Sequence, residues 1–416
     1  MPELSVLHLS THDYGGAGKA ALRIHSALLN ANINSKMLVK FRRSKVEDVY
    51  NINVPPSKLK LNKLIEVFIR RIQYREKYNM YSPADNSAGN IISSIEALEF
   101  KPDVLILHWV ANFVSLADIK HIKETYNCSI YWYAMDMAPL TGGCHYAWDC
   151  KGYLDKCSDC PATFSYNPFQ CPEQYFHNKK QLVEELGINA IASNQWVAEQ
   201  IKASSMPFKQ IDVCYLPIDD EVFKPVYNQK EIDSAGALKL FFGAVNVDDE
   251  RKGGKYFLLA LDKLRGLLEG SKLEFIHPVI ILPGEKKAHI DRRIPFEIRR
   301  YPYAHTEKEL NLLYQSADVF ICTSIEDTGP MMVCESLMSG IPVVSFSMGV
   351  CPELIKDDNN GFVVENRDVD SLAQAIFNFI MKDTKALDAI KVNARESVVS
   401  VMSNKSHTDK ILEIIS

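Results

Sequence analysis

The chain has no long hydrophobic run. No apolar segment approaches the roughly 20 residues that a membrane-spanning helix needs, although hydrophobic residues make up 47% of the 416 positions. The first residues show no basic segment followed by an apolar core, so no signal peptide is expected. The formal net charge of −5 argues against a surface built for nucleic acid. These absences predict a cytoplasmic protein that binds no nucleic acid.

Internal repeats of short period and low-complexity segments are also missing. Short apolar, β-branched runs instead alternate with amphipathic stretches, the pattern of parallel sheets covered by helices on both faces. A chain of 416 residues is too long for one compact core. The expected fold class is therefore α/β, with two Rossmann-like, doubly wound domains that face each other across a cleft. The predicted strands are 4–9, 37–39, 103–108, 129–133 and 190–192 in the first half, and 238–243, 279–282, 318–322 and 342–346 in the second.

The domain boundaries follow from a polar connection that starts at Leu216-Pro217. The first domain is expected over residues 1–216 and the second over 237–390. The last stretch, 391–416, has no strand pattern and is expected to be helical.

Four of the ten cysteines gather in one short stretch of the first domain. In a reducing compartment such a cluster favours metal over disulfides. Four thiolates, two of them in a Cys-x2-Cys pair, suit tetrahedral zinc in a closed structural site without a catalytic role. The spacing is Cys144-x5-Cys150-x6-Cys157-x2-Cys160.

We therefore predict a structural zinc in a cysteine-rich insertion over about 141–172. His145 or Cys171 could replace one ligand. An iron–sulfur cluster and four free thiols are the alternatives.

A glycine-rich turn follows the first predicted strand, at Gly15-Gly16-Ala17-Gly18. Glycines where a strand turns into a helix let backbone N–H groups approach an anion, and the helix dipole favours negative charge there. Gly15 and Gly16 are therefore candidate ligand contacts. A tight turn without a ligand is the alternative.

Two acidic residues, Asp327 and Glu335, follow the predicted strand 318–322 with seven residues between them. The segment resembles the acidic-x7-acidic signature of the family 4 glycosyltransferases, which have the GT-B fold and retain the anomeric configuration. The resemblance implies that Glu335 binds the ribose hydroxyls of a nucleotide and that Asp327 faces the donor sugar. Backbone amides where the helix starts can bind a diphosphate. The amides concerned belong to Gly329, Met331 and Met332. Two solvated acids at a helix end are the alternative.

An upstream loop, 241–254, resembles the donor-phosphate loop of the same family. A cation must offset the charge that builds on the leaving diphosphate, and Lys252 fits this role with Arg251 beside it. Many relatives carry an Arg directly after the first glycine, where this chain has Ala244. Lys252 would then have to offset more of the charge on the leaving diphosphate. An exposed basic turn is the alternative.

Finer matches resemble one branch of the family, the enzymes of colanic acid and O-antigen polysaccharide synthesis. The branch carries a His-Trp pair after a core strand, here His108-Trp109, and a Thr-Gly-Gly-Cys-His-Tyr run, here 141–146. It also carries a His-Asp pair where this chain has Met135-Asp136. Because Met135 cannot replace that histidine, His108 becomes the candidate for donor or acceptor contacts. A structural histidine at a strand end is the alternative.

The resemblance implies a retaining transfer of sugar from a nucleotide diphosphate donor to a glycan or a lipid-linked acceptor. UDP is favoured over GDP as the leaving group, no catalytic metal is expected, and the tail 391–416 would cross back to the first domain. The alternatives are a nucleotide-sugar epimerase with this fold and a protein that binds a nucleotide sugar without turnover.

A basic amphipathic segment follows Pro55-Pro56-Ser57. Seven basic and two acidic side chains give residues 58–77 a net charge of +5. Such a helix can lie on anionic lipid, which would place the protein at the inner face of the cytoplasmic membrane. An ordinary packed helix with a solvated basic face is the alternative. The predicted apolar face consists of Leu61, Leu64, Ile65, Phe68 and Ile72.

Overall fold

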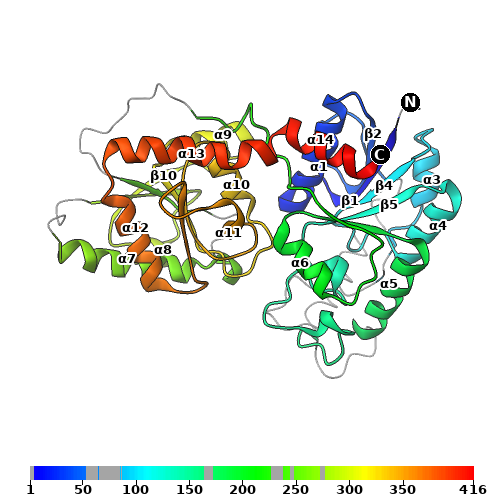
Figure 1. Ribbon diagram of the computed structural model, residues 1–416, viewed down its shortest axis with the longest axis horizontal. Helices are drawn as coiled ribbons and strands as arrows, with labels where there is room; N and C mark the ends of the chain where they lie inside the picture. The colour runs from blue at the N-terminus through cyan, green and yellow to red at the C-terminus, as the bar shows by residue number, and fades with distance from the viewer. Residues whose placement is uncertain are drawn as a thin grey trace. The chain divides into compact units, whose positions relative to one another are not determined.

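The computed structural model divides the chain into two compact units, each built on a parallel sheet (Figure 1). The first unit contains Met1–Pro217 and His407–Ser416, and the second contains Ile218–Ser406. The structure describes residues 4–52, 64, 85, 87–163, 172–225, 238–243, 248–271 and 277–416.

Within its described residues, the first unit has a seven-stranded sheet in the order β3-β2-β1-β4-β5-β6-β7. The central strands β1 and β4 are buried almost throughout, because helices cover both faces of a parallel sheet. The strands are β1 (Ser5–His12), β2 (Asn34–Phe41), β3 (Val49–Asn51), β4 (Val104–Leu107), β5 (Ser129–Ala134), β6 (Asn189–Ala192) and β7 (Ile211–Val213). The helices are α1 (Gly15–Asn30), α3 (Ile91–Glu96), α4 (Leu116–Tyr126), α5 (Pro172–Leu186), α6 (Gln195–Ala203) and α14 (Asn404–Ile415).

The second unit has a six-stranded sheet among its described residues, in the order β10-β9-β8-β11-β12-β13. Helix α7 packs against α12, and α10 packs against α13; the two pairs lie on opposite sides of the sheet in Figure 1. The strands are β8 (Lys239–Phe241), β9 (Val279–Pro283), β10 (Glu297–Tyr301), β11 (Val319–Cys322), β12 (Val343–Phe346) and β13 (Gly361–Val364). The helices are α7 (Gly254–Glu269), α8 (Ala288–Asp291), α9 (Glu307–Gln315), α10 (Met331–Met338), α11 (Cys351–Leu354), α12 (Val369–Ile380) and α13 (Thr384–Met402).

The strand order reverses once in each sheet, between β1 and β4 in the first unit and between β8 and β11 in the second. Ligands of doubly wound sheets bind at the carboxyl ends of the strands, where the order reverses. A ligand site is therefore expected in the loops that follow these four strands.

The predicted apolar runs all coincide with strands, whereas four strands were not predicted: β3, β7, β10 and β13. These four are the edges of the two sheets. An edge strand has one neighbour and is partly exposed, as the burial of β7 and β10 shows. Its sequence therefore lacks a continuous apolar run.

The C-terminal stretch forms two helices, where a single helix was expected for 391–416. Ser403 breaks the helix with extended backbone (φ −60°, ψ 155°). Its hydroxyl then accepts a hydrogen bond from the Ser406 N–H at 3.2 Å, so the serine caps α14.

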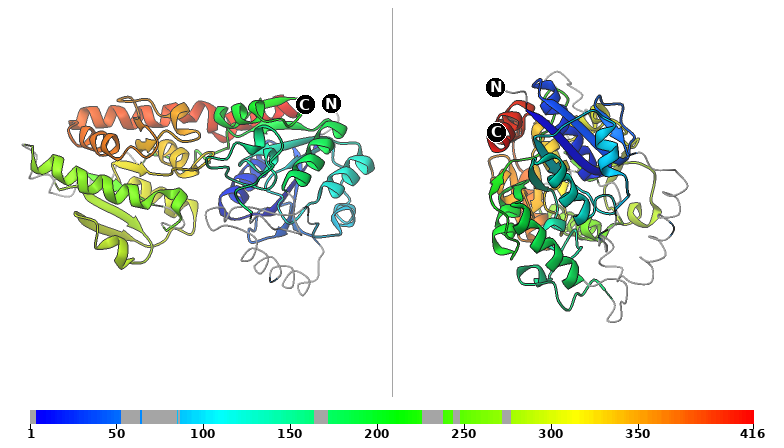
Figure 2. Two further views of the ribbon diagram at one scale, coloured as in Figure 1. Left: turned by 90° about the horizontal axis from the view of Figure 1, so that it is seen from below. Right: turned by 90° about the vertical axis from the view of Figure 1, so that its right-hand side faces the viewer.

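Helix α14 packs on the first unit, beside α1 (Figures 1 and 2). The Tyr131 hydroxyl donates to the Ile414 carbonyl at 3.0 Å. The His407 ring bonds the Tyr215 carbonyl through Nδ1 at 2.8 Å. The last ten residues therefore complete the first unit rather than the second.

Arg395 of α13 joins three parts of the second unit through its guanidinium. Its nitrogens donate to the carbonyls of Asp220 (3.1 Å), Phe223 (2.8 Å) and Met338 (2.6 Å). Arg395→Met should lower the free energy of unfolding by about 2–4 kcal/mol, because charge-assisted hydrogen bonds are lost and buried carbonyls are left without donors. Chemical denaturation measures this loss. Lys385→Met on the same helix is the control, since Lys385 is exposed; equal effects of the two substitutions would contradict the prediction.

Candidate functional site

The core of the site in the second unit is an ion pair between Lys252 and Asp327. Lys252 follows β8, and Asp327 follows β11, the two strands at which the order reverses. The Lys252 Nζ donates to Asp327 Oδ2 at 2.6 Å. The lysine side chain is 26% exposed and the aspartate 8%, so the pair is sheltered while the ammonium group still reaches solvent.

Asp327 stays ionised because its partners outweigh its burial. Burial raises the pKa of this carboxyl, but the charge and hydrogen bond of Lys252, the charge of Arg251 and the Gly329 N–H lower it further. The net pKa lies below the ordinary value. The Gly329 N–H donates to Oδ1 at 3.2 Å, so both carboxylate oxygens have a donor.

Backbone contacts fix the two loops against each other. The Ile325 N–H donates to the Arg251 carbonyl at 2.8 Å, and the Thr323 hydroxyl donates to the Lys252 carbonyl at 3.0 Å. Gly253 makes this approach possible: a Cβ there would lie 1.8 Å from the Thr323 oxygen, and its φ is +67°. Only glycine fits both conditions.

Helix α10 begins at Met331, four positions after Asp327, and has no acidic residue in its first turn. Amides at a helix start lack intrahelical partners and favour an anion, and Met331 and Met332 supply them here. The Met332 side chain also lies beside the end of β8, since a Cβ on Gly243 would be 3.3 Å from its methyl group. The helix start and the β8 loop therefore border the same place.

Glu335 lies one turn into α10 and is only 5% exposed. The Tyr314 hydroxyl donates to Glu335 Oε2 at 3.2 Å and lies 3.1 Å from the Met332 carbonyl. Tyr314 is fully buried among phenylalanine rings. It orients a carboxylate that the sequence had singled out, although Tyr314 itself gave no sequence signal beyond an apolar helix position.

The Arg251 residue is 8% exposed, and its guanidinium group contacts an aspartate instead of pointing outward. Its Nη2 donates to Asp249 Oδ2 at 2.8 Å. The neighbouring Asp248 binds Lys287 at 2.6 Å and His289 at 2.9 Å, which ties this loop to the one after β9. Arg251 therefore supports the loop that presents Lys252.

In the first unit, Gly15 and Gly16 lie at the start of α1 as predicted from the turn. Gly15 has φ +74°, and a Cβ on either glycine would meet no atom within 4 Å. Helix α1 has no side-chain cap and no acidic residue in its first turn. The space beside these glycines is open to an anion.

His108 lies in the interior, at the carboxyl end of β4, and is 3% exposed. Its Nε2 lies 2.9 Å from His8 Nδ1, with the two rings stacked. Burial, with the charges of His25 and His407, lowers the pKa of His108 to about 3. His108 is thus a neutral, packed histidine that also lines a pocket with Trp109.

That pocket lies where β4 and β5 end and contains a hydrogen-bonded Asp-His pair that the sequence analysis had not assigned. His145 Nδ1 lies 2.6 Å from Asp136 Oδ2. Asp136 and His145 lie nine positions apart, before and after the short helix Ala138–Leu140. Both stand in runs that carry the family resemblance, but neither run indicated that the two side chains meet.

The four cysteines of the predicted zinc site line one small pocket of the first unit. The Gly142 N–H donates to Cys157 Sγ at 3.2 Å, and a hydrogen bond with Cys144 lowers the pKa of Cys160 to about 7. Even so, among the described residues no three His, Cys, Asp or Glu side chains stand in an arrangement that could hold a metal ion. The structure does not support the zinc prediction. Cys171, an alternative ligand, lies outside the described residues.

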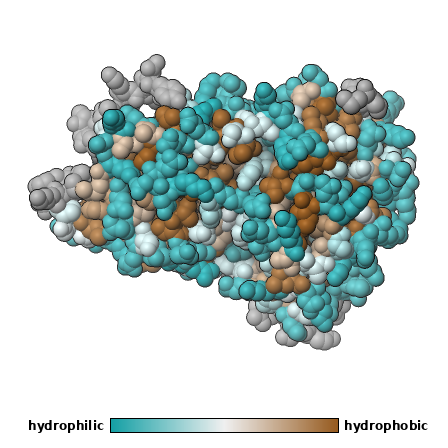
Figure 3. All heavy atoms as spheres, in the orientation of Figure 1, coloured by the Kyte–Doolittle hydropathy of each residue, from teal (hydrophilic) through white to brown (hydrophobic). Residues whose placement is uncertain are grey.

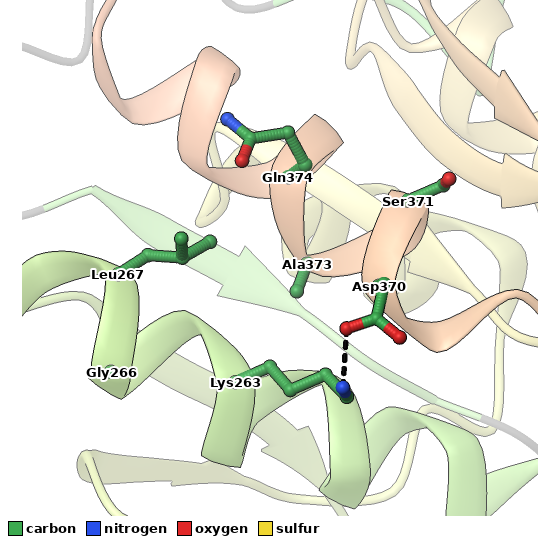
Figure 4. A pocket seen from close by; sticks show the side chains of 7 residues that line it. All are labelled: Lys263, Gly266, Leu267, Asp370, Ser371, Ala373 and Gln374. Atoms are coloured by element: carbon green, nitrogen blue, oxygen red, sulfur yellow. Dashed lines mark hydrogen bonds and ion pairs between the residues drawn. The ribbon is translucent and has the colours of Figure 1, made fainter.

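A further groove lies between α7 and α12 (Figure 4). Lys263 and Asp370 face each other across it as an ion pair. None of the residues that line it was singled out by the sequence.

The predicted membrane-contact segment, 58–77, lies outside the described residues except for Leu64, and so does Ala244. Among the described helices, none is long and apolar enough to cross a bilayer. The face drawn in Figure 3 is largely hydrophilic, with hydrophobic residues in small groups.

Solved structures share this two-unit architecture. Sucrose-phosphate synthase from Thermosynechococcus elongatus matches with a TM-score of 0.67 at 12% identity, over 99% of this chain and 98% of the other. HepE from Anabaena, solved in complex with UDP, matches with a TM-score of 0.64 at 14% identity, over 99% of both chains. These likenesses show the fold.

Residues 239–397 match the family model described as "Glycosyl transferases group 1". This range contains Lys252, Asp327 and Glu335. The second unit is similar to this family, and the two-unit architecture is the GT-B fold.

Two sequence relatives are named as enzymes of colanic acid synthesis. "Putative colanic acid biosynthesis glycosyl transferase WcaC" of Escherichia coli is 22% identical over 87% of this chain and 89% of its own length. "Putative colanic acid biosynthesis glycosyltransferase WcaL" of Salmonella typhimurium is 23% identical over 59% of this chain. The match spans about half of that relative, 52% of its length.

The buried histidines of the first unit make the stability of the protein depend on pH. Burial lowers the pKa of His8, His108 and His407, the last two to about 3 and 4. The unfolded chain takes up protons near pH 6.5 while the folded chain does not, so stability is full above that pH and falls below it. Each histidine should cost about 1.4 kcal/mol per pH unit below 6.5.

Urea unfolding between pH 7.5 and 5 measures this dependence. His407→Gln should have a smaller slope than the natural protein, because one depressed histidine is removed. A flat free energy of unfolding over this range would contradict the assignment.

Proposed function

We propose that this protein is a retaining GT-B glycosyltransferase that moves a sugar from a nucleotide diphosphate donor to a glycan or lipid-linked oligosaccharide during surface polysaccharide synthesis. The observation that carries the proposal is the Lys252–Asp327 pair beside the start of α10. A cation and a row of helix amides at a topological switch point suit a diphosphate leaving group.

The donor would be held by residues of the second unit. Amides of Gly329, Met331 and Met332 would face the diphosphate, and Lys252 would balance its charge. Glu335, oriented by Tyr314, would accept the ribose hydroxyls. Asp327 would hold Lys252 before the donor arrives and face the donor sugar once the diphosphate has drawn the ammonium group away.

The chemistry would be a substitution on one face of the sugar. The bond between the anomeric carbon and the diphosphate oxygen breaks as the acceptor oxygen bonds to that carbon. The leaving phosphate oxygen takes the acceptor's proton, so no protein nucleophile is needed. Lys252 and the helix dipole stabilise the leaving group, with Arg251 in support, so no divalent metal is required for this step.

UDP is our preferred leaving group, with GDP as the second choice. HepE, which shares the fold, is solved with UDP and with UDP-glucose. A relative at 26% identity over 24% of this chain is named as a UDP-galactose-dependent galactosyltransferase acting on a diphosphoundecaprenol-linked sugar. We also propose that Gly15 and Gly16 bind an anionic group of the ligand and that His108 contacts the donor or the acceptor. Segment 58–77 would contact anionic lipid, and the protein would work at the cytoplasmic face of the membrane.

Lys252→Met should reduce kcat/KM about 100- to 1,000-fold, because the leaving group loses its cation. Lys255→Met is the matched control, since Lys255 is an exposed neighbour on α7. Release of UDP and glycan product from UDP-sugars, with and without acceptor, gives the rates. Thermal stabilisation by UDP, GDP and ADP identifies the nucleotide.

The same measurements separate the alternatives. Conversion of the donor sugar without acceptor would indicate an epimerase. Nucleotide binding without turnover, abolished by Glu335→Ala, would indicate a binding protein. Full activity of Lys252→Met would overturn the proposed site.

We keep zinc as a second proposal, supported by the four thiols around one pocket and by the N–H groups of Gly142 and Gly152 that donate to sulfur. The thiolates would have to close on the ion. Elemental analysis of the untagged chain should find one zinc per chain, reduced by Cys157→Ser and unchanged by Cys128→Ala. Less than about half an equivalent of zinc, with no iron, would refute this.

A further inference from the structure

Tyr314, on α9, is fixed in the core of the second unit by three phenylalanine rings. The tyrosine is fully buried. Its ring centroid lies 5.4 Å from that of Phe241 and 6.0 Å from that of Phe320, both in edge contacts, and 6.3 Å from that of Phe223. Phe241 ends β8 and Phe320 lies in β11, the strands at which the order reverses. The position of the tyrosine hydroxyl is therefore set by the sheet itself.

The Tyr314 hydroxyl reaches the first turns of α10, where it has two acceptors. It lies 3.2 Å from Glu335 Oε2 and 3.1 Å from the Met332 carbonyl oxygen. A phenol carries one proton, and both distances exceed the roughly 2.7–2.8 Å of an ordinary O–H···O bond. The two acceptors therefore share the proton. The shared bond restrains the Glu335 side chain against the start of the helix that carries it.

Glu335 is 5% exposed, so its carboxylate depends on hydrogen-bond donors rather than on water. A carboxylate accepts about four hydrogen bonds, and Tyr314 offers it only a shared proton. A ligand with two adjacent hydroxyl groups adds two donors, whereas a ligand with one hydroxyl group adds one and binds less tightly. This difference depends on the carboxylate staying in place, because a side chain that is free to turn can find other donors.

We propose that Tyr314 makes the donor site selective for sugars of ribonucleoside diphosphates over those of 2′-deoxyribonucleoside diphosphates. Ribose carries two adjacent hydroxyl groups, and 2′-deoxyribose carries only one of them. Tyr314 is a positioning residue: it holds Glu335 where both hydroxyl groups of a ribose can donate to the carboxylate, and it acts on the donor only through Glu335. The inference rests on the proposed function, since it takes Glu335 as the residue that binds the ribose.

Titration of the full chain with UDP, GDP and ADP and with their 2′-deoxy forms tests the selectivity. The nucleotide that the natural protein binds should bind about 10- to 100-fold more tightly than its 2′-deoxy form, because the deoxy form leaves the buried carboxylate short of a donor. Tyr314→Phe keeps the ring and removes only the hydroxyl. It should reduce this ratio of affinities about 5-fold or more.

Tyr133→Phe is the matched control, because it removes a buried tyrosine hydroxyl from the first unit. Tyr133 is 1% exposed, and its hydroxyl donates to the Cys214 carbonyl at 2.6 Å. This variant should keep the ribose-to-deoxyribose ratio of the natural protein. Glu335→Gln leaves the aromatic packing around Tyr314 untouched and should also lower the ratio. Urea unfolding shows whether each variant is folded.

A KM-against-kcat split separates positioning from packing. In transfer assays Tyr314→Phe should raise the KM of the donor about 5-fold and leave kcat within about 2-fold, because the ribose is remote from the bond that breaks. A purely structural role would instead reduce the active fraction. It would lower kcat while the ribose-to-deoxyribose ratio stayed the same.

The outcomes separate this inference from the proposed function. If a nucleotide and its 2′-deoxy form bind equally well, or if Tyr314→Phe leaves their ratio unchanged, the inference is wrong while the proposed function stands. If the ratio behaves as expected but no sugar is transferred to any acceptor, the proposed transfer is wrong and the ribose selectivity stands. If UDP, GDP and ADP all fail to bind the natural protein, both are overturned.

Discussion

The site of the second unit depends on one close contact, the approach of the loop after β8 to the loop after β11. Gly253 permits it, because its missing side chain leaves room for the Thr323 carbonyl. The contact brings a lysine and an aspartate together at 2.6 Å in a sheltered position. Sheltered charges are costly to separate, at roughly 3–5 kcal/mol when one partner is lost. The pair is thus stable without ligand, yet a stronger anion can compete for the ammonium group.

The parallel sheets explain why these particular loops meet. All strands of a parallel sheet have their carboxyl ends on the same side of the sheet. Where the strand order reverses, two adjacent loops are left without a helix between them. The same rule places the Asp136–His145 pair at the corresponding edge of the first unit. Both units therefore place charged side chains at the carboxyl ends of their strands: a lysine–aspartate pair in the second unit, and an aspartate–histidine pair in the first.

The sequence predicted the buried central strands of both sheets but not the edge strands. Strands such as β4 and β11 are buried along their whole length and therefore read as continuous apolar runs, whereas β7 and β10 are half-exposed and do not. In the site, Asp327 and Lys252 were identified from motifs, but their mutual ion pair spans 75 positions and has no local signature. Tyr314, which orients Glu335 from 21 positions away, was missed for the same reason. The contact of Asp136 with His145 spans only nine positions and was missed because it depends on how the loop between them folds. The four cysteines show the converse: their spacing suggested ligands, but the thiols line a pocket without the arrangement of a metal site.

The last helix has a consequence for how the protein is made. Since α14 belongs to the first unit, the polypeptide leaves that unit after Pro217 and returns to it at His407. On the ribosome the first unit is therefore still missing a segment when the second has been synthesised, and the Tyr131 and Thr408 contacts with α14 and α1 form only after the end of the chain has emerged. Domains usually fold one after the other during synthesis; here the earlier one is complete only after the later one has been synthesised.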